Sequence, residues 1–227
     1  MGLSLRTNQK RVSAKKFFLK RLLIFLLGTF LLSLGMAVMI RAELGVSTWD
    51  VLHIGLSRHT QLSVGTAVVV IGFLLIALKY ALDRKVPRLG TFANAILIGC
   101  FFNLIQYLNF IPTFTDIWIN ILFLILGVCL MGFGAGIYVS AGIGEGPRDG
   151  LTIAIANRFS FSIRFVRTIL EATVLIVGFL LGGPVSIGTF LSIFLIGPIF
   201  QASLSFMNKQ VEKAEEKVVE IRLYKVR

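Results

Sequence analysis

The sequence predicts an all-α membrane protein with six transmembrane helices, arranged as a 3+3 inverted repeat that includes two short broken or re-entrant helices. Three observations predict this fold: the scarcity of charged residues, the placement of the lysines and arginines, and an internal repeat. Of the 227 residues, 56% are hydrophobic and 15% are charged, whereas soluble domains carry about 25% charged residues. The composition therefore places the chain in the membrane class.

Apolar runs define the expected spans. A helix needs about 20 apolar residues to cross the hydrocarbon core of a bilayer. The runs that reach this length are Phe18 to Ile40, Val64 to Leu82, Leu89 to Phe110, Ile117 to Val139, Phe165 to Leu181 and Ile187 to Phe206. Two shorter stretches, Trp49 to Ser57 and Arg148 to Ala156, have about half of the spanning length. We expect them to be helices that enter the membrane without crossing it.

The basic residues predict the orientation. The formal net charge of +12 comes largely from the first 21 residues, from Lys79 to Arg88 and from Lys209 to Arg227. If the two short stretches do not cross, these segments lie on one side of the membrane. The positive-inside rule assigns that side to the cytoplasm, where lysine and arginine face anionic lipid. We therefore expect both termini in the cytoplasm and no binding of nucleic acid.

The second half of the chain repeats the first. Ala42, Gly45, Asp50 and Leu52 coincide with Ala141, Gly144, Asp149 and Leu151, and Leu89-Gly90-Thr91-Phe92 coincides with Ile187-Gly188-Thr189-Phe190. The expected organisation is a basic segment (residues 1–17), a first repeat (18–110), a second repeat (117–206) and a charged cytoplasmic tail (207–227). Each repeat holds three spans, so the second is inserted upside down, as in many secondary transporters.

Asp50 and Asp149 are the first candidate site residues, because each falls in the first turn of a short helix. One interpretation is structural: the carboxylate caps its own helix and is favoured by the helix dipole. The other is functional: the two helix ends face each other, the carboxylates bind a cation or proton, and the free amides bind an anionic group. The sequence leaves both interpretations open.

Arg148 and Glu171 complete the set of candidate residues for a substrate site. Charged groups inside a membrane protein are costly and often functional. Arg148 is expected to meet an anionic substrate or to pair with Glu145 or Asp149. Glu171 follows Arg167 by four residues in the fifth span, so an ion pair within the helix competes with a role for Glu171 as a proton carrier.

No motif in the sequence indicates an enzyme, a cofactor or a metal site. No nucleophile stands in a recognisable catalytic motif, and no nucleotide-binding loop is complete. Cys100 and Cys129 both lie in apolar runs without metal-ligand spacing, which predicts buried structural thiols. Gly132 and Gly136, and Gly178 and Gly182, have the spacing that lets helices approach closely.

The duplicated Ala-x-Leu/Ile-Gly-x-x-x-x-Asp segment, Pro147-Arg148-Asp149-Gly150 and the repeated Gly-Thr-Phe turn resemble the YczE/YyaS/YitT family of bacterial membrane proteins. The resemblance covers about Leu19 to Phe206 and is strongest to the YczE-like branch. It implies a bacterial cytoplasmic membrane and carries over no binding residues. One position differs from the expected pattern: Thr48 stands where a proline matching Pro147 is expected.

Two functions fit these observations. The first is a small secondary transporter or permease of unknown substrate, with a central site between the repeats. The second is a membrane-embedded binding or accessory subunit that transports nothing alone. The expected surroundings are a lipid bilayer and an unknown small-molecule substrate, and either a homodimer or a partner subunit is compatible with the sequence.

Overall fold

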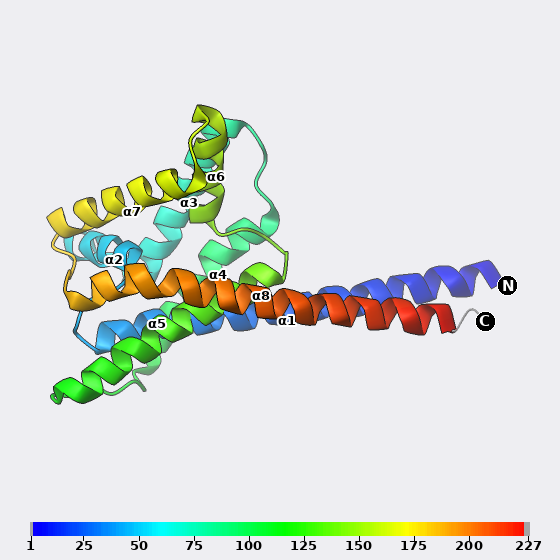
Figure 1. The fold of residues 1–227 in the computed structure, drawn as a ribbon, viewed down its shortest axis with the longest axis horizontal. Helices are drawn as coiled ribbons and strands as arrows, with labels where there is room; N and C mark the ends of the chain where they lie inside the picture. Colours follow the sequence, from blue (N-terminus) through cyan, green and yellow to red (C-terminus); the bar gives the residue numbers. More distant parts are fainter. Residues whose placement is uncertain (1, 225–227) are drawn as a thin grey trace.

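The computed structural model describes residues 2–224, and it describes the side chains of residues 18–211. This part of the chain consists of eight α-helices and has no β-strand (Figure 1). The helices are α1 (Gly2–Arg41), α2 (Thr48–His59), α3 (Val64–Asp83), α4 (Leu89–Leu108), α5 (Ile117–Ser140), α6 (Pro147–Phe159), α7 (Ile163–Leu180) and α8 (Ile187–Tyr224).

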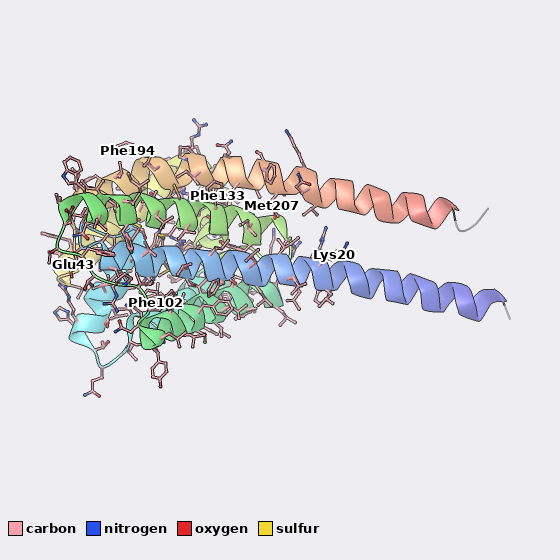
Figure 2. All side chains as sticks on the ribbon, turned by 90° about the horizontal axis from the view of Figure 1, so that it is seen from below. Lys20, Glu43, Phe102, Phe133, Phe194 and Met207 are labelled. Atoms are coloured by element: carbon pink, nitrogen blue, oxygen red, sulfur yellow. The ribbon has the colours of Figure 1, made fainter. Side chains whose placement is uncertain are left out.

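Five helices are long and apolar enough to cross a membrane. They are the segments Phe18–Arg41 of α1, Val64–Asp83, Leu89–Leu108, Ile117–Ser140 and Ile187–Val211 of α8. Their outer faces carry large exposed apolar side chains, including Phe133 and Phe194 (Figure 2). Water would be an unfavourable surrounding for so large an apolar surface, so the chain is a membrane protein.

The fifth predicted span in chain order is also a helix, but its composition differs from that of the other five. Phe165 to Leu181 falls almost entirely within α7, which has 18 residues. Three of these residues, Arg164, Arg167 and Glu171, are charged. Because of these charges, α7 is not among the five helices that are long and apolar enough to cross a membrane. That α7 crosses the membrane therefore remains a prediction.

Glycines bring α1 and α5 into backbone contact along their length. A methyl group on Gly28 would lie 2.8 Å from the Gly134 carbonyl oxygen, and one on Gly35 would lie 2.7 Å from the Gly127 carbonyl oxygen. The order of the partners reverses between the two helices, so α1 and α5 run antiparallel. We call these four residues the glycine seam.

The glycine pairs singled out in the sequence have different partners. Gly132 and Gly136 allow α8 to approach α5 at Ile199 and Ser203, as their spacing predicted. Gly178 touches the backbone of α2, whereas Gly182 follows the end of α7 with a φ of 72°. A φ of this sign suits glycine at the end of a helix.

The two predicted short helices are present as α2 and α6. They have 12 and 13 residues, which correspond to about 18–20 Å of helix, shorter than the hydrocarbon core. α2 packs against α3 and α7, and α6 packs against α3 and α7. Thr48, Trp49 and Asp50, at the start of α2, are all buried, so this helix begins inside the bundle.

Both chain termini project from the same end of the bundle, carried by the extended parts of α1 and α8 (Figure 1). Figure 2 shows Lys20 near this end and Glu43 at the opposite end. The end of α3 lies at the same end of the bundle as the termini (Figure 1). Lys79, near the end of α3, is 3.8 Å from Glu145, so the link between α5 and α6 lies at this end too. The link between α1 and α2 lies at the opposite end, where the Gly188 amide donates to the Leu44 carbonyl (2.7 Å).

Candidate functional site

A cavity of about 310 Å³ lies among α2, α5, α6, α7 and α8. We call it the main cavity. Its volume is at the lower end of the range for cavities that bind small molecules. Polar side chains line one part of it, and Ile193, Ile196 and Phe200 of α8 line another. A cavity of this size and mixed character fits a small solute with polar and apolar groups.

The first turns of both short helices line the main cavity. α2 contributes Thr48 and Trp49, and α6 contributes Arg148 and Asp149. Neither helix has a side-chain hydrogen bond from its N-cap residue, Ser47 in α2 and Gly146 in α6. The N-terminal amides of both helices thus lack this cap, and the helix dipoles favour a negative group there.

α7 contributes an ion pair to the main cavity. Arg167 Nε lies 3.3 Å from Glu171 Oε1, and both residues line the cavity. The side chains are 51% and 29% exposed, so the pair is accessible from the cavity. The pairing expected from the four-residue spacing is confirmed, and it does not remove Glu171 from the candidate site.

Arg148 contacts an aromatic ring rather than a carboxylate. Its guanidinium carbon lies 5.3 Å from the centre of the Trp49 ring, a cation–π contact between the two short helices. The expected ion pairs with Glu145 and Asp149 are not among those formed by the described side chains, and Glu145 lies beside Lys79. The Arg148 side chain is therefore held over Trp49 and forms no ion pair with a carboxylate of the described side chains.

Asp50 lines a second cavity, of about 50 Å³, which we call the small cavity. Its side chain is almost fully buried. The Ser47 hydroxyl donates to Asp50 Oδ2 (2.6 Å), and His53 Nδ1 lies 3.4 Å from Asp50 Oδ1. The described partners of this carboxylate are side chains and not amides of α2, so the geometry differs from that of the predicted helix cap.

The four predicted site residues are thus divided between two cavities. Arg148, Asp149 and Glu171 line the main cavity, whereas Asp50 lines the small one. Arg148 lines both cavities, as do Trp49 and Tyr138. Together with Leu32 and Met131, which also line both cavities, these side chains give them a common wall.

Polar residues of α4 have two different roles. Asn103 Oδ1 accepts hydrogen bonds from Ser63 Oγ (2.9 Å) and from the Gly65 amide (3.1 Å), so it joins α4 to α3. Asn94 is buried and lines the small cavity, and its side-chain nitrogen has no hydrogen-bond partner. The sequence did not distinguish these roles.

One expected burial is wrong. Cys100 is exposed on the surface of α4, and Cys129 is partly buried. An apolar run does not reveal which face of its helix meets the bundle, and in a membrane protein a small thiol on the outer face contacts lipid at little cost. Neither cysteine lines either cavity.

The sequence profile of a family of unknown function, DUF6198, matches residues 19–204. The chain belongs to this family. It is 37% identical over 179 residues to the uncharacterized membrane protein YczE of Bacillus subtilis (strain 168), a match covering 78% of the chain and 82% of YczE. The resemblance drawn from the repeated motifs is confirmed.

Two further relatives of this DUF6198 protein extend the comparison. An uncharacterized protein of Haemophilus influenzae is 33% identical over 83% of the chain and 85% of its own length. The uncharacterized protein YyaS of Bacillus subtilis is 29% identical over 81% of the chain and 92% of YyaS. No solved structure matches the chain. The family assignment therefore supports the membrane location and leaves the activity to be inferred from the site.

Sequence reasoning did not identify Trp49, His53 and Tyr138 as partners of the site. A signal for His53 existed, because it follows Asp50 by three residues and so lies on the same face of the helix. Trp49 is adjacent to Asp50, but its contact with Arg148 joins residues 99 positions apart. Tyr138 lies within an apolar run, and nothing in the sequence indicates that it faces the cavities.

Proposed function

We propose that this DUF6198 protein is a small secondary transporter of the bacterial cytoplasmic membrane, and that the solute binds in the main cavity. One observation carries the proposal: two half-length helices begin inside the bundle, and their first turns line a cavity of solute size. Broken helices whose ends meet at a central cavity are typical of secondary transporters. Irregular backbone at membrane depth is tolerated where it is buried in protein or lines a water-filled cavity.

Pairs of equivalent contacts support an inverted repeat. α2 of the first half packs against α7 of the second, and α6 of the second half packs against α3 of the first. Likewise, α1 packs against α4 within the first half, and their equivalents α5 and α8 pack against each other within the second half. Glu43 and Gly142, equivalent in the sequence repeat, have φ values of 53° and 64°. The antiparallel course of α1 and α5 fits two copies of opposite orientation.

The positions of the termini support α7 as a further span, which brings the number of spans to six. Five crossings would place the termini on opposite sides of the membrane, whereas both project from one end of the bundle (Figure 1). The charged residues Arg167 and Glu171 of α7 line the main cavity, so a crossing by α7 need not expose them to lipid. The positive-inside rule then favours a cytoplasmic location for the terminal end, next to Lys79 and the basic α3–α4 link.

The two halves differ in one respect that suits transport. α3 and α4 pack along each other, whereas α7 and α8 make hardly any direct contact. The main cavity lies between α7 and α8, and the smaller cavity adjoins α3 and α4. An alternating-access cycle would exchange these arrangements, closing α7 against α8 as α3 separates from α4.

Thermal unfolding of the purified protein in detergent tests the solute site. A panel of amino acids, sugars, organic acids and nucleosides is screened for stabilisation, which reaches about 2.7 kcal/mol at a concentration 100 times Kd. We expect a solute that stabilises the parent but not Asp149→Asn or Glu171→Gln, each compared with its own unliganded sample. Glu43→Gln is the matched control, because Glu43 is an exposed acid outside both cavities.

Uptake into liposomes then distinguishes transport from binding. The stabilising solute, in radiolabelled form, should accumulate in liposomes that contain the parent protein and not in those that contain Asp149→Asn. Stabilisation that persists in both cavity variants would contradict the site. Binding without uptake would contradict transport.

A second candidate function is a binding or accessory subunit of a larger membrane complex. The observation that favours it is the projection of α1 and α8 beyond the bundle (Figure 1), since two helices at one end offer a docking surface. The liposome experiment separates the two functions, because an accessory subunit moves no solute alone. Copurification with an ATPase would support the second function.

A further inference from the structure

The small cavity contains an acid, a base and an unpaired amide. Asp50 and His53 of α2 line it together with Asn94 of α4. Asp50 is 2% exposed, His53 is 7% exposed and Asn94 is 1% exposed. Polar groups buried this deeply are expensive unless they have partners, and in a membrane protein they usually have a function.

Asp50 and His53 form a pair that can hold one additional proton. With an ionised carboxylate and a neutral imidazole, the pair has a charge of −1. Binding of one proton on either side chain brings the charge to 0, and release of that proton restores the charge. The separation of 3.4 Å between Nδ1 and Oδ1 allows the two side chains to share the proton after a small movement.

The Asn94 side chain adds a further polar group to the lining of the small cavity. Its nitrogen is a buried donor without a protein partner, and such donors are normally satisfied by water or a ligand. A cavity of about 50 Å³ exceeds the roughly 10–15 Å³ that one water molecule requires. A water molecule in this cavity would provide a route for a proton to the pair.

Few other ionisable groups face the small cavity. Arg148 of α6 and Tyr138 of α5 line it, whereas α1 and α3 contribute only apolar residues and a glycine. The Arg167 and Glu171 pair of α7 lines the main cavity, beyond Trp49. Arg148 is therefore the described cation that borders both cavities.

We propose that Asp50 and His53 form a proton-binding site that controls the charge available to the solute in the main cavity. When the pair is at −1, its field draws the Arg148 guanidinium toward the small cavity. When the pair binds a proton, this attraction is removed and Arg148 is free to contact an anionic group of the solute. Proton binding and anion binding then favour each other. This inference rests on the proposed transport function, to which it assigns the coupling ion.

Fluorescence of Trp49 tests proton binding without a solute. The chain has two tryptophans, so Trp118→Phe leaves Trp49 alone, adjacent to Asp50 and under Arg148. We expect the emission of this variant to change with pH in a single transition, because the charge next to Trp49 changes when the pair binds a proton. Addition of Asp50→Asn or His53→Gln should abolish the transition. His59→Gln, at the exposed end of the same helix, should leave it unchanged.

Histidine-selective ¹⁵N NMR supplies a second measurement that does not require a change at Asp50. The chain has two histidines, so His59→Gln leaves the His53 ring as the only signal. We expect that signal to move from its neutral to its protonated position over the same pH range as the Trp49 transition. A His53 signal that does not change, or a Trp49 transition that persists in a folded Asp50→Asn variant, would overturn the proposal. Absence of solute uptake would overturn the transport function and leave both titrations intact.

Discussion

Trp49 is the residue through which the two cavities and the two short helices meet. Its indole ring is buried, supports the Arg148 guanidinium and forms part of both cavity walls. This aromatic side chain thus contributes to the wall between the cavities and contacts the Arg148 guanidinium. Substitution of this residue should affect stability and binding together.

Trp49→Leu should lower the free energy of unfolding by about 2 kcal/mol, because it removes both buried aromatic area and the cation–π contact. Thermal unfolding in detergent measures the effect. The matched control is Trp118→Leu, since Trp118 is 76% exposed at the start of α5, and surface substitutions usually change stability by less than about 0.5 kcal/mol. Equal losses in the two variants would contradict the assigned role of Trp49.

The Arg167–Glu171 pair should contribute little to stability. Arg167 is half exposed, and pairs of this kind are worth about 0–1 kcal/mol. A double-mutant cycle with Arg167→Gln and Glu171→Gln should therefore give a coupling energy below about 1 kcal/mol. A coupling of several kcal/mol would show that the pair is sealed from solvent and would count against Glu171 as a solute contact.

At the residue scale, the sequence singled out charged residues that line cavities, but it did not predict their partners. Arg148, Asp149 and Glu171 all line one cavity, but Asp50 lies in another. The repeat treats Asp50 and Asp149 as equivalent, yet their surroundings differ: His53 follows Asp50, and its counterpart after Asp149 is Thr152. Side-chain partners depend on such local differences, which a repeat pattern ignores.

Among the elements, α1 and α5 form a pair with little tolerance for substitution at their contact. The glycine seam joins their backbones, and any side chain inserted there meets main-chain atoms of the other helix. Overpacking of this kind cannot be relieved by a change of rotamer in the neighbour, so the helices would have to separate.

Gly35→Ala should lower the free energy of unfolding by about 1–3 kcal/mol, because its new methyl group would meet the backbone of α5. The control is Gly197→Ala in α8, where a methyl group would have nothing within 4 Å, and where alanine favours the helix by up to about 1 kcal/mol. Unfolding in detergent compares the two. A stability of Gly35→Ala equal to that of the parent would show that the seam is looser than its geometry indicates.

The helices themselves were largely predictable, and the reason lies in their composition. Apolar length identified the five recognised spans, and the glycine and proline residues before the short helices predicted α2 and α6 to within a few residues. α6 begins at Pro147, a favoured first residue of a helix. α2 begins at Thr48 without a proline, so the missing proline did not prevent a helix from starting at the equivalent point.

The glycine seam was not anticipated, because a glycine in an apolar run shows neither the face it occupies nor the helix it meets. Gly28 and Gly35 are seven residues apart, as are Gly127 and Gly134, and the two pairs are themselves equivalent in the repeat. The seven-residue spacing of these glycine pairs, and their equivalence in the repeat, were visible in the sequence. Its meaning became clear only from the antiparallel contact of α1 with α5.

For the whole molecule, cysteine labelling tests the orientation. In a variant lacking both natural cysteines, Arg84→Cys places a thiol in the α3–α4 link and Thr113→Cys places one in the exposed α4–α5 link. A membrane-impermeant maleimide applied to intact cells should label Thr113→Cys and not Arg84→Cys, because we expect the basic link to be cytoplasmic. Labelling of both in opened membranes is the control. The reverse result in intact cells would invert the proposed topology.

The long-range arrangement could be predicted only in part. The repeat and the charge distribution predicted an inverted pair, and the contacts between equivalent helices support it. The separation of α7 from α8, which gives the main cavity its size, has no counterpart between α3 and α4. A repeated sequence predicts two similar halves. The difference between the α7–α8 and α3–α4 pairs depends on the conformation of the folded chain, which the repeat does not predict.

The glycine seam also limits how the molecule can change shape. Where two backbones touch without side chains between them, no rotamers are available to absorb sliding or tilting. α1 and α5 then move together as one rigid body, and any change of shape comes from movement of the other helices relative to this pair. α7 packs against α2 and α6 and makes hardly any contact with α8. A rearrangement that preserves the seam can therefore move α7 against α8.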